Sequence, residues 1–109
     1  MFEYHARLIR VLDGDTVEMD LDLGFDVHYV SPVRLKGINA PELHGETHAA
    51  GLAARDHLAQ LLSKSDLIVR TELHKDKDKY GRVLGTFLSG EINVNAQMID
   101  DGFAVPYLT

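Results

Sequence analysis

The sequence predicts a small α+β protein, mainly β, in which five strands close into a Greek-key barrel. Two observations carry this prediction. Strand-forming segments bounded by turn residues recur along the chain, whereas only one long segment has helical periodicity. These elements follow one another as three strands, a main helix, two strands and a short helix. With 109 residues, of which 45% are apolar, the chain is long enough for one core and is expected to form a single domain, residues 1–109.

The first half supplies three strands. Residues 3–12 are rich in β-formers, and an Asp13-Gly14 turn follows them. Residues 16–23 alternate strictly, with one apolar and one acidic face: Val17, Met19, Leu21 and Leu23 against Glu18, Asp20 and Asp22. A turn at residues 24–26 leads into a third strand over 27–38, in which Pro32 indicates a bulge or an edge position.

The second half supplies the helices and two further strands. A helix is expected over residues 46–63, with one apolar face made of Ala50, Ala54, Leu58, Leu61 and Leu62. Strands follow at 67–69 and 83–88, joined by a charged loop over 74–81. Ser89-Gly90 forms a turn, Asn93 caps a short helix over 94–101, and Gly102 ends it. This order is that of the oligonucleotide-binding barrel.

The overall charge and the absence of cysteine narrow the function classes. Eleven basic and seventeen acidic residues give a net charge of −6, which argues against a broad nucleic-acid-binding surface but leaves room for a local positive site. Without cysteine the chain has no disulfides and no thiolate-ligated zinc. No apolar run approaches the length of a membrane span, so no membrane association is expected. No leader is recognisable, and a cytoplasmic location, in a phage-encoded or cellular protein, is expected.

Two acidic residues stand at the first turn, in Asp13-Gly14-Asp15-Thr16. An Asp-Gly turn alone explains the pattern as a hairpin. Asp15, however, opens the second strand, where its carboxylate can project into the barrel mouth. A carboxylate at that position suits calcium or magnesium, which prefer oxygen ligands.

Two arginines and a glutamate form the second set of candidates. Arg34 lies among apolar neighbours, as either one half of a structural ion pair or a fixed fork for phosphate oxygens. Glu42, directly after Pro41, is placed to orient or deprotonate a water. Arg82 opens a strand at the barrel rim, where it could stabilise the charge of a pentacoordinate phosphate. A zinc site at His44 and His48 is the disfavoured interpretation, because their spacing is not that of a zinc peptidase, and His57 is placed on the polar face of the main helix.

The ordered motifs Asp-Gly-Asp-Thr, Arg-Leu-x-x-Ile-Asn-x-Pro-Glu, Asp-Lys-Tyr-Gly-Arg and Val94-Asn95 resemble those of the staphylococcal nuclease (thermonuclease) family over about residues 6–107. The resemblance implies a calcium-dependent endonuclease that cleaves DNA and RNA with little sequence preference and leaves 3′-phosphates.

Carried over by position, the resemblance assigns roles to single residues. Catalytic roles fall on Arg34, Glu42 and Arg82, calcium ligation on Asp15, Asn39 and the Ala40 carbonyl, and substrate contacts on Lys79, Tyr80 and Tyr107.

Three departures from the family pattern leave alternatives open. Asn39 stands where the family has a second calcium aspartate, Tyr107 is offset from the family's substrate-side tyrosine, and the hairpin around residues 22–32 differs. The C-terminal helix of longer family members is also missing from this sequence, which leaves both a monomer and a homodimer open. The rival interpretation is a catalytically weak barrel that binds nucleic acid or a protein.

Overall fold

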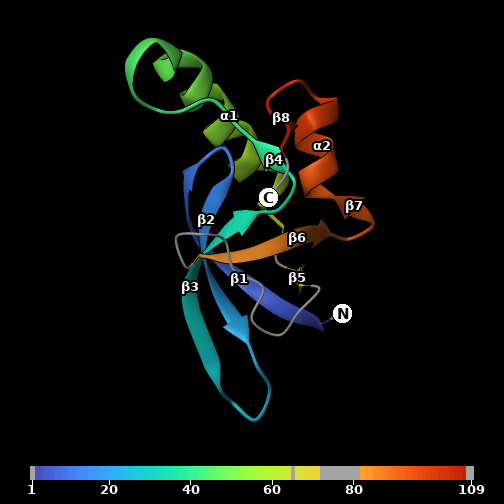
Figure 1. Ribbon diagram of the computed structural model, residues 1–109. Helices are drawn as coiled ribbons and strands as arrows, with labels where there is room; N and C mark the ends of the chain where they lie inside the picture. Colours follow the sequence, from blue (N-terminus) through green and yellow to red (C-terminus); the bar gives the residue numbers. More distant parts are fainter. Residues whose placement is uncertain (1, 65, 72–81, 108–109) are drawn as a thin grey trace.

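The protein is described by a computed structural model, which covers residues 2–64, 66–71 and 82–107. Five strands form a closed barrel in the order β3-β2-β1-β5-β6, and a parallel pairing between β3 and β6 closes it (Figure 1). This confirms the predicted mainly-β barrel with one main helix and one short helix. The barrel strands are β1 Phe2–Asp13, β2 Thr16–Asp22, β3 His28–Leu35, β5 Leu67–Thr71 and β6 Val83–Ser89. The remaining elements are β4 Ile38–Asn39, the 3-10 turn η1 Gly45–Thr47, α1 His48–Leu61, β7 Ile92–Asn93, α2 Val94–Asp100 and β8 Val105–Pro106.

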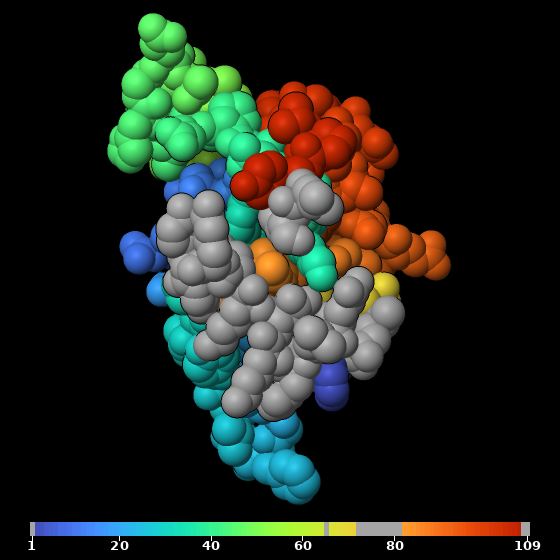
Figure 2. Space-filling model, viewed as in Figure 1, coloured from blue at the N-terminus to red at the C-terminus, as the bar shows by residue number. Residues whose placement is uncertain are grey.

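The core follows from the alternation in the strands and fills the barrel and the space beneath the helices. Barrel strands and helices each contribute fully buried side chains, namely Val17, Met19, Val33, Leu35, Val69, Phe87, Ala54, Leu58, Val94 and Met98. Both helices lie at one end of the barrel, and the β2–β3 hairpin projects from the other (Figures 1 and 2). None of the helices in the described ranges has the length and hydropathy needed to cross a membrane.

The tip of the β2–β3 hairpin is the turn predicted at residues 24–26. Gly24, Phe25 and Asp26 all have positive φ, and the Val27 N–H donates to the Gly24 carbonyl at 2.9 Å. Leu23 was expected on the buried face, but it lies beyond the last β2–β3 pair and is exposed. Alternation in sequence therefore extends one residue further than the sheet does.

The barrel closes where β3 meets β6, with Val33 paired to Val83 and Arg34 to Leu84. Pro32 precedes this pairing, and the β2–β3 register runs through it without a shift. Among the described residues, Pro32 thus has a paired strand on one side only, which favours the predicted edge position over a bulge.

The predicted third strand is too long. It ends at Leu35, because Gly37 adopts a positive φ of 82° and turns the chain. Ile38 and Asn39 then form β4, which pairs with β8 outside the barrel sheet. These two-residue strands have no periodicity, so no sequence pattern predicted them. Their pairing fixes the segment that contains three of the candidate site residues.

The main helix is also shorter than the predicted range 46–63, because a 3-10 turn occupies residues 45–47. Ala50, expected on the apolar face, is exposed, and Gly51 is buried in its place. The short helix begins as predicted, since the Asn93 side chain accepts the Ala96 N–H at 3.0 Å, and Gly102 follows its end with positive φ.

Candidate active site

The Asp13–Thr16 turn joins β1 to β2 against the helical end of the barrel. The Asp15 N–H donates to Asp13 Oδ1 at 2.9 Å, an Asx turn that sets the direction of the Asp15 backbone. Gly14 is packed so tightly that a Cβ would stand 2.6 Å from the Ala40 Cβ and 2.7 Å from the Ala54 Cβ. The turn is therefore wedged between the segment after β4 and helix α1.

The Asp15 carboxylate is buried and bonded on both oxygens. Oδ1 accepts the Thr16 hydroxyl at 3.1 Å, and Oδ2 accepts the Ala40 N–H at 2.9 Å. Oδ2 also lies 3.3 Å from Arg34 Nη1, within ion-pair distance. The side chain predicted to face a cation is thus oriented by two donors and neutralised by an arginine.

The Arg34 guanidinium connects Asp15 with the segment 38–39. Nη2 donates to the Ile38 carbonyl at 3.0 Å and to Asn39 Oδ1 at 3.3 Å. Nη1 is buried and has the ion-pair contact with Asp15 but no hydrogen-bond partner, because the contact lacks hydrogen-bond geometry. The Tyr107 ring covers the group, with its centroid 5.6 Å from Cζ. Only 6% of Arg34 is exposed. The sequence left open whether Arg34 forms a structural ion pair or binds phosphate oxygens, and the structure contains the ion pair.

A second carboxylate stands beside this pair. Burial, together with the hydrogen bond to Asp15, raises the pKa of Asp13 from its ordinary value of 3.8 to about 6. Asp13 therefore ionises less readily than an exposed aspartate.

Glu42 follows the site segment and is exposed. Its backbone is held from two sides. The Thr47 hydroxyl donates to the Glu42 carbonyl at 2.7 Å, and the Gly51 backbone of α1 lies against the same oxygen. Contacts with Thr47 of η1 and with Gly51 of α1 thus hold the backbone at Glu42, two residues beyond Ala40.

Arg82 immediately precedes β6 and is partly buried. Arg34 pairs with Leu84 in β6. Arg82 therefore enters the barrel seam two residues before the partner of Arg34. Lys79 and Tyr80, the other candidates from this motif, are outside the described residues.

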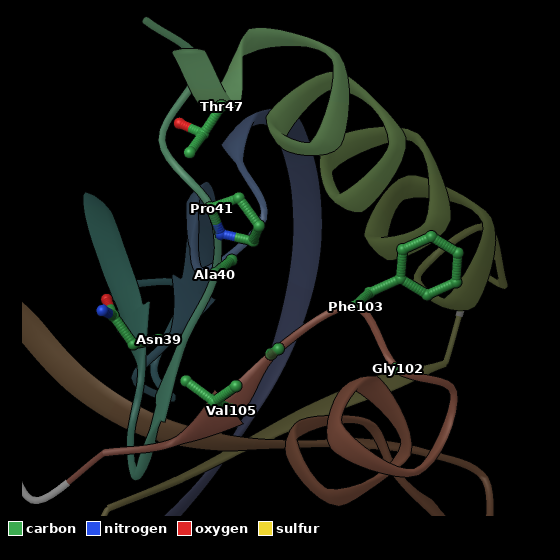
Figure 3. Close-up of a pocket in the computed structure, with 8 residues that line it drawn as sticks. Asn39, Ala40, Pro41, Thr47, Gly102, Phe103 and Val105 are labelled. Atoms are coloured by element: carbon green, nitrogen blue, oxygen red, sulfur yellow. The ribbon is translucent and has the colours of Figure 1, made fainter. Parts of the chain in front are cut away.

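A pocket of about 310 Å³ borders the site on the side of the helices (Figure 3). Asn39, Ala40 and Pro41 line one side, and Phe103 and Val105 approach from the C-terminal segment. Its walls are mainly apolar, and its volume is at the lower end of the range for small-molecule sites. The candidate cation ligand Asn39 therefore has an apolar surface beside it.

The residues expected to hold a divalent cation fit such an ion in donor type. Asp15 Oδ2 and Asn39 Oδ1 each lie 3.3 Å from a nitrogen of one guanidinium, so oxygens from two separate segments converge on one cationic group. Both are hard oxygen donors of the kind calcium and magnesium take. Ala40 is tied to this set through its N–H, which donates to Asp15.

The histidines belong to other parts of the molecule. His48 Nδ1 lies 2.5 Å from the Leu43 carbonyl. His57 is not simply on a polar helix face, because it stacks on Phe103 at 4.2 Å and bonds Asp101 at 2.7 Å. It joins α1 to the end of α2, a role that its position in the helix did not reveal.

The structure thus brings five predicted site residues together: Asp15, Arg34, Asn39, Ala40 and Tyr107. Sequence reasoning missed the Ile38 carbonyl and the packing of Gly14 and Gly51. It also missed the function of Asn95, whose Oδ1 accepts the Phe87 N–H and whose Nδ2 donates to the Lys36 and Gly85 carbonyls. The motif Val94-Asn95 was the available signal for that side chain, which anchors the turn before β4.

Comparison with known proteins agrees with this fold. The family model described as staphylococcal nuclease homologue matches residues 32–109. The chain therefore belongs to the staphylococcal nuclease family.

Curated relatives extend the match to nearly the whole chain. Protein ParB of Escherichia coli is 34% identical over 96% of this chain and 58% of its own length. Endonuclease YhcR of Bacillus subtilis (strain 168) is 34% identical over 96% of this chain and 9% of its own length. An uncharacterized endonuclease of Escherichia coli is 32% identical over 96% of this chain and 62% of its own length. The chain spans less than two thirds of each of these relatives.

Proposed function

We propose that this protein is a divalent-cation-dependent endonuclease that hydrolyses phosphodiester bonds of DNA and RNA without sequence preference. The convergence of Asp15 and Asn39 oxygens on the buried Arg34 guanidinium carries this proposal. It supplies a cationic group and hard oxygen ligands at one place, with Glu42 close by in sequence. Family membership and the two relatives named as endonucleases support it.

Each group has a role in the proposed reaction. Arg34 and Arg82 neutralise the charge that develops on the phosphate oxygens. Glu42 orients a water and takes its proton, so that the water oxygen bonds to phosphorus. The bond from phosphorus to the 5′-oxygen breaks, the 5′-oxygen takes up a proton, and a 3′-phosphate remains. Lys79 and Tyr80 contact the substrate's terminal phosphate and sugar, and Tyr107 is the third residue assigned to substrate binding.

Calcium is the proposed cation, held by Asp15, Asn39 and the Ala40 carbonyl. A bound divalent cation polarises a phosphoryl oxygen and stabilises negative charge on it. Asn39 supplies an oxygen but no charge, so weaker calcium binding is expected than with two aspartates. With a net charge of −6, the protein is expected to show only weak salt-dependent, non-specific binding of nucleic acid away from this site.

Digestion of single-stranded DNA by the purified protein tests the proposal, with calcium, magnesium and a chelator in parallel. Cleavage with calcium, no cleavage with chelator and 3′-phosphate ends on the products are expected. Glu42→Gln should reduce the rate by about 10²–10⁴-fold while nucleotide binding persists. A folded protein that cleaves with none of the ions, or a Glu42→Gln variant of undiminished rate, would contradict the proposal.

A second candidate is a binding module that holds nucleic acid without cutting it. One observation favours it: Asp15 already neutralises Arg34, which is mostly buried under Tyr107. Binding of a fluorescent oligonucleotide that is equal in wild type and in Glu42→Gln, without cleavage by either protein, would support this candidate.

A further inference from the structure

Arg34 is the cation that the structure places against both candidate ligand oxygens. Its Nη1 lies 3.3 Å from Asp15 Oδ2, and its Nη2 lies 3.3 Å from Asn39 Oδ1. Asp15 and Arg34 are 8% and 6% exposed, so water screens their charges little. One guanidinium thus occupies the charged position that these two oxygens create.

The Asp15 carboxylate cannot turn away to serve a second cation without losing other bonds. The Ala40 N–H and the Thr16 hydroxyl hold its two oxygens at 2.9 and 3.1 Å. Of the three contacts, the one with Arg34 is an ion pair without hydrogen-bond geometry. A cation that binds the Asp15 carboxylate would therefore replace Arg34 rather than the Ala40 N–H or the Thr16 hydroxyl.

A divalent cation placed on Asp15 beside an unmoved Arg34 would meet a like charge in a poorly screened setting. The divalent cation and the Arg34 guanidinium would therefore compete for Asp15 Oδ2. We propose that Arg34 is a built-in competitor of the divalent cation, so that calcium binds Asp15 and Asn39 only by displacing the Asp15–Arg34 ion pair.

This inference rests on the proposed function only in taking Asp15 and Asn39 as cation ligands. It makes Arg34 a determinant of cation affinity, separately from any contact with phosphate. The measured calcium affinity then reflects how much more strongly the Asp15 and Asn39 oxygens bind calcium than they bind the Arg34 guanidinium. Because Asn39 is neutral, this difference in binding free energy is small.

Calorimetric titration of calcium into the protein, without nucleic acid, tests the competition. Arg34→Gln and Arg34→Met both remove the charge, and methionine also retains most of the buried volume. Both variants should bind calcium about tenfold more tightly than wild type. Arg70→Gln is the matched control, because it removes the same charge from a pair with Glu3 at the far end of β1. Its calcium affinity should stay within about twofold of wild type.

A second measurement needs no variant. In wild-type protein with ¹⁵N-labelled arginine, calcium should shift the Arg34 side-chain signals and leave those of Arg70 in place. Unchanged or weaker calcium binding by a folded Arg34 variant, or unmoved Arg34 signals at saturating calcium, would overturn the inference. Tighter calcium binding by the variants, together with a wild type that cuts no DNA, would instead refute the proposed function and leave the competition standing.

Discussion

Gly51 in α1 lies directly against the carbonyl oxygen of Glu42, so closely that a Cβ at position 51 would overlap that oxygen and approach the Leu43 Cα to 3.0 Å. A glycine inside a helix is ordinarily a cost of about 0.5–1 kcal/mol relative to alanine. Here it lets the helix pack onto the segment that follows β4. The position of the proposed catalytic carboxylate therefore depends on a missing side chain in another element.

Replacing Gly51 with alanine should reverse the usual effect of that substitution. Propensity alone predicts a stabilised helix, whereas the overlap with Glu42 predicts a destabilisation of about 1–3 kcal/mol. Displacement of Glu42 by about 1 Å should also lower kcat by about 10²-fold. Urea unfolding and single-stranded DNA digestion measure the two effects. Ala53→Ser, at an exposed position of the same helix, is the control. A Gly51→Ala protein that is more stable and fully active would show that the loop adjusts without consequence.

The barrel and the site segments were predictable because their signals are local. Alternation defined β2, Asp-Gly defined the first turn, and Asn93 defined the start of α2. The contacts between elements were not predictable in this way. Arg34 in β3 forms its ion pair with Asp15 in the turn between β1 and β2, and Gly51 looked like a weak point of a helix rather than a packing surface. A sequence pattern predicts which face of a helix or strand is apolar, but it does not predict which backbone atoms of another element that face contacts.

Asn95 should be far more important for stability than its neighbour Asn93. Asn95 is buried and makes three hydrogen bonds that join β6, the turn after β3 and α2. Asn95→Ala leaves a buried N–H and two carbonyls without this partner and should cost about 3 kcal/mol. Asn93→Ala removes one exposed cap bond and should cost about 1 kcal/mol. Urea denaturation of both variants gives the comparison, and equal losses would contradict the anchoring function of Asn95.

Tyr107 should contribute through its ring rather than its hydroxyl. The ring covers the Arg34 guanidinium and is about half exposed, so it is positioned to restrict that group and to meet a substrate. Tyr107→Phe should keep wild-type kcat/KM on a single-stranded oligonucleotide. Tyr107→Ala should lower it about tenfold. Tyr29→Ala removes a comparably exposed tyrosine from the β2–β3 hairpin and serves as the control. Equal losses in the Phe and Ala variants would assign the effect to the hydroxyl instead.

Asp101 should make stability depend on pH at the junction of the two helices. Hydrogen bonds from His57 and then Gln97 hold the pKa of Asp101 below its ordinary value of 3.8. The folded state therefore favours the ionised form, so the stabilisation is present above pH 3.8 and disappears as the pH falls through the lowered pKa. Asp101→Asn should lower the urea midpoint at pH 7, and the difference from wild type should shrink as the pH falls below 3.8. Asp100→Asn, one residue earlier and exposed, should show neither effect. If Asp101→Asn lowered the urea midpoint equally at every pH, Asp101 would stabilise the fold through its shape and not through its charge.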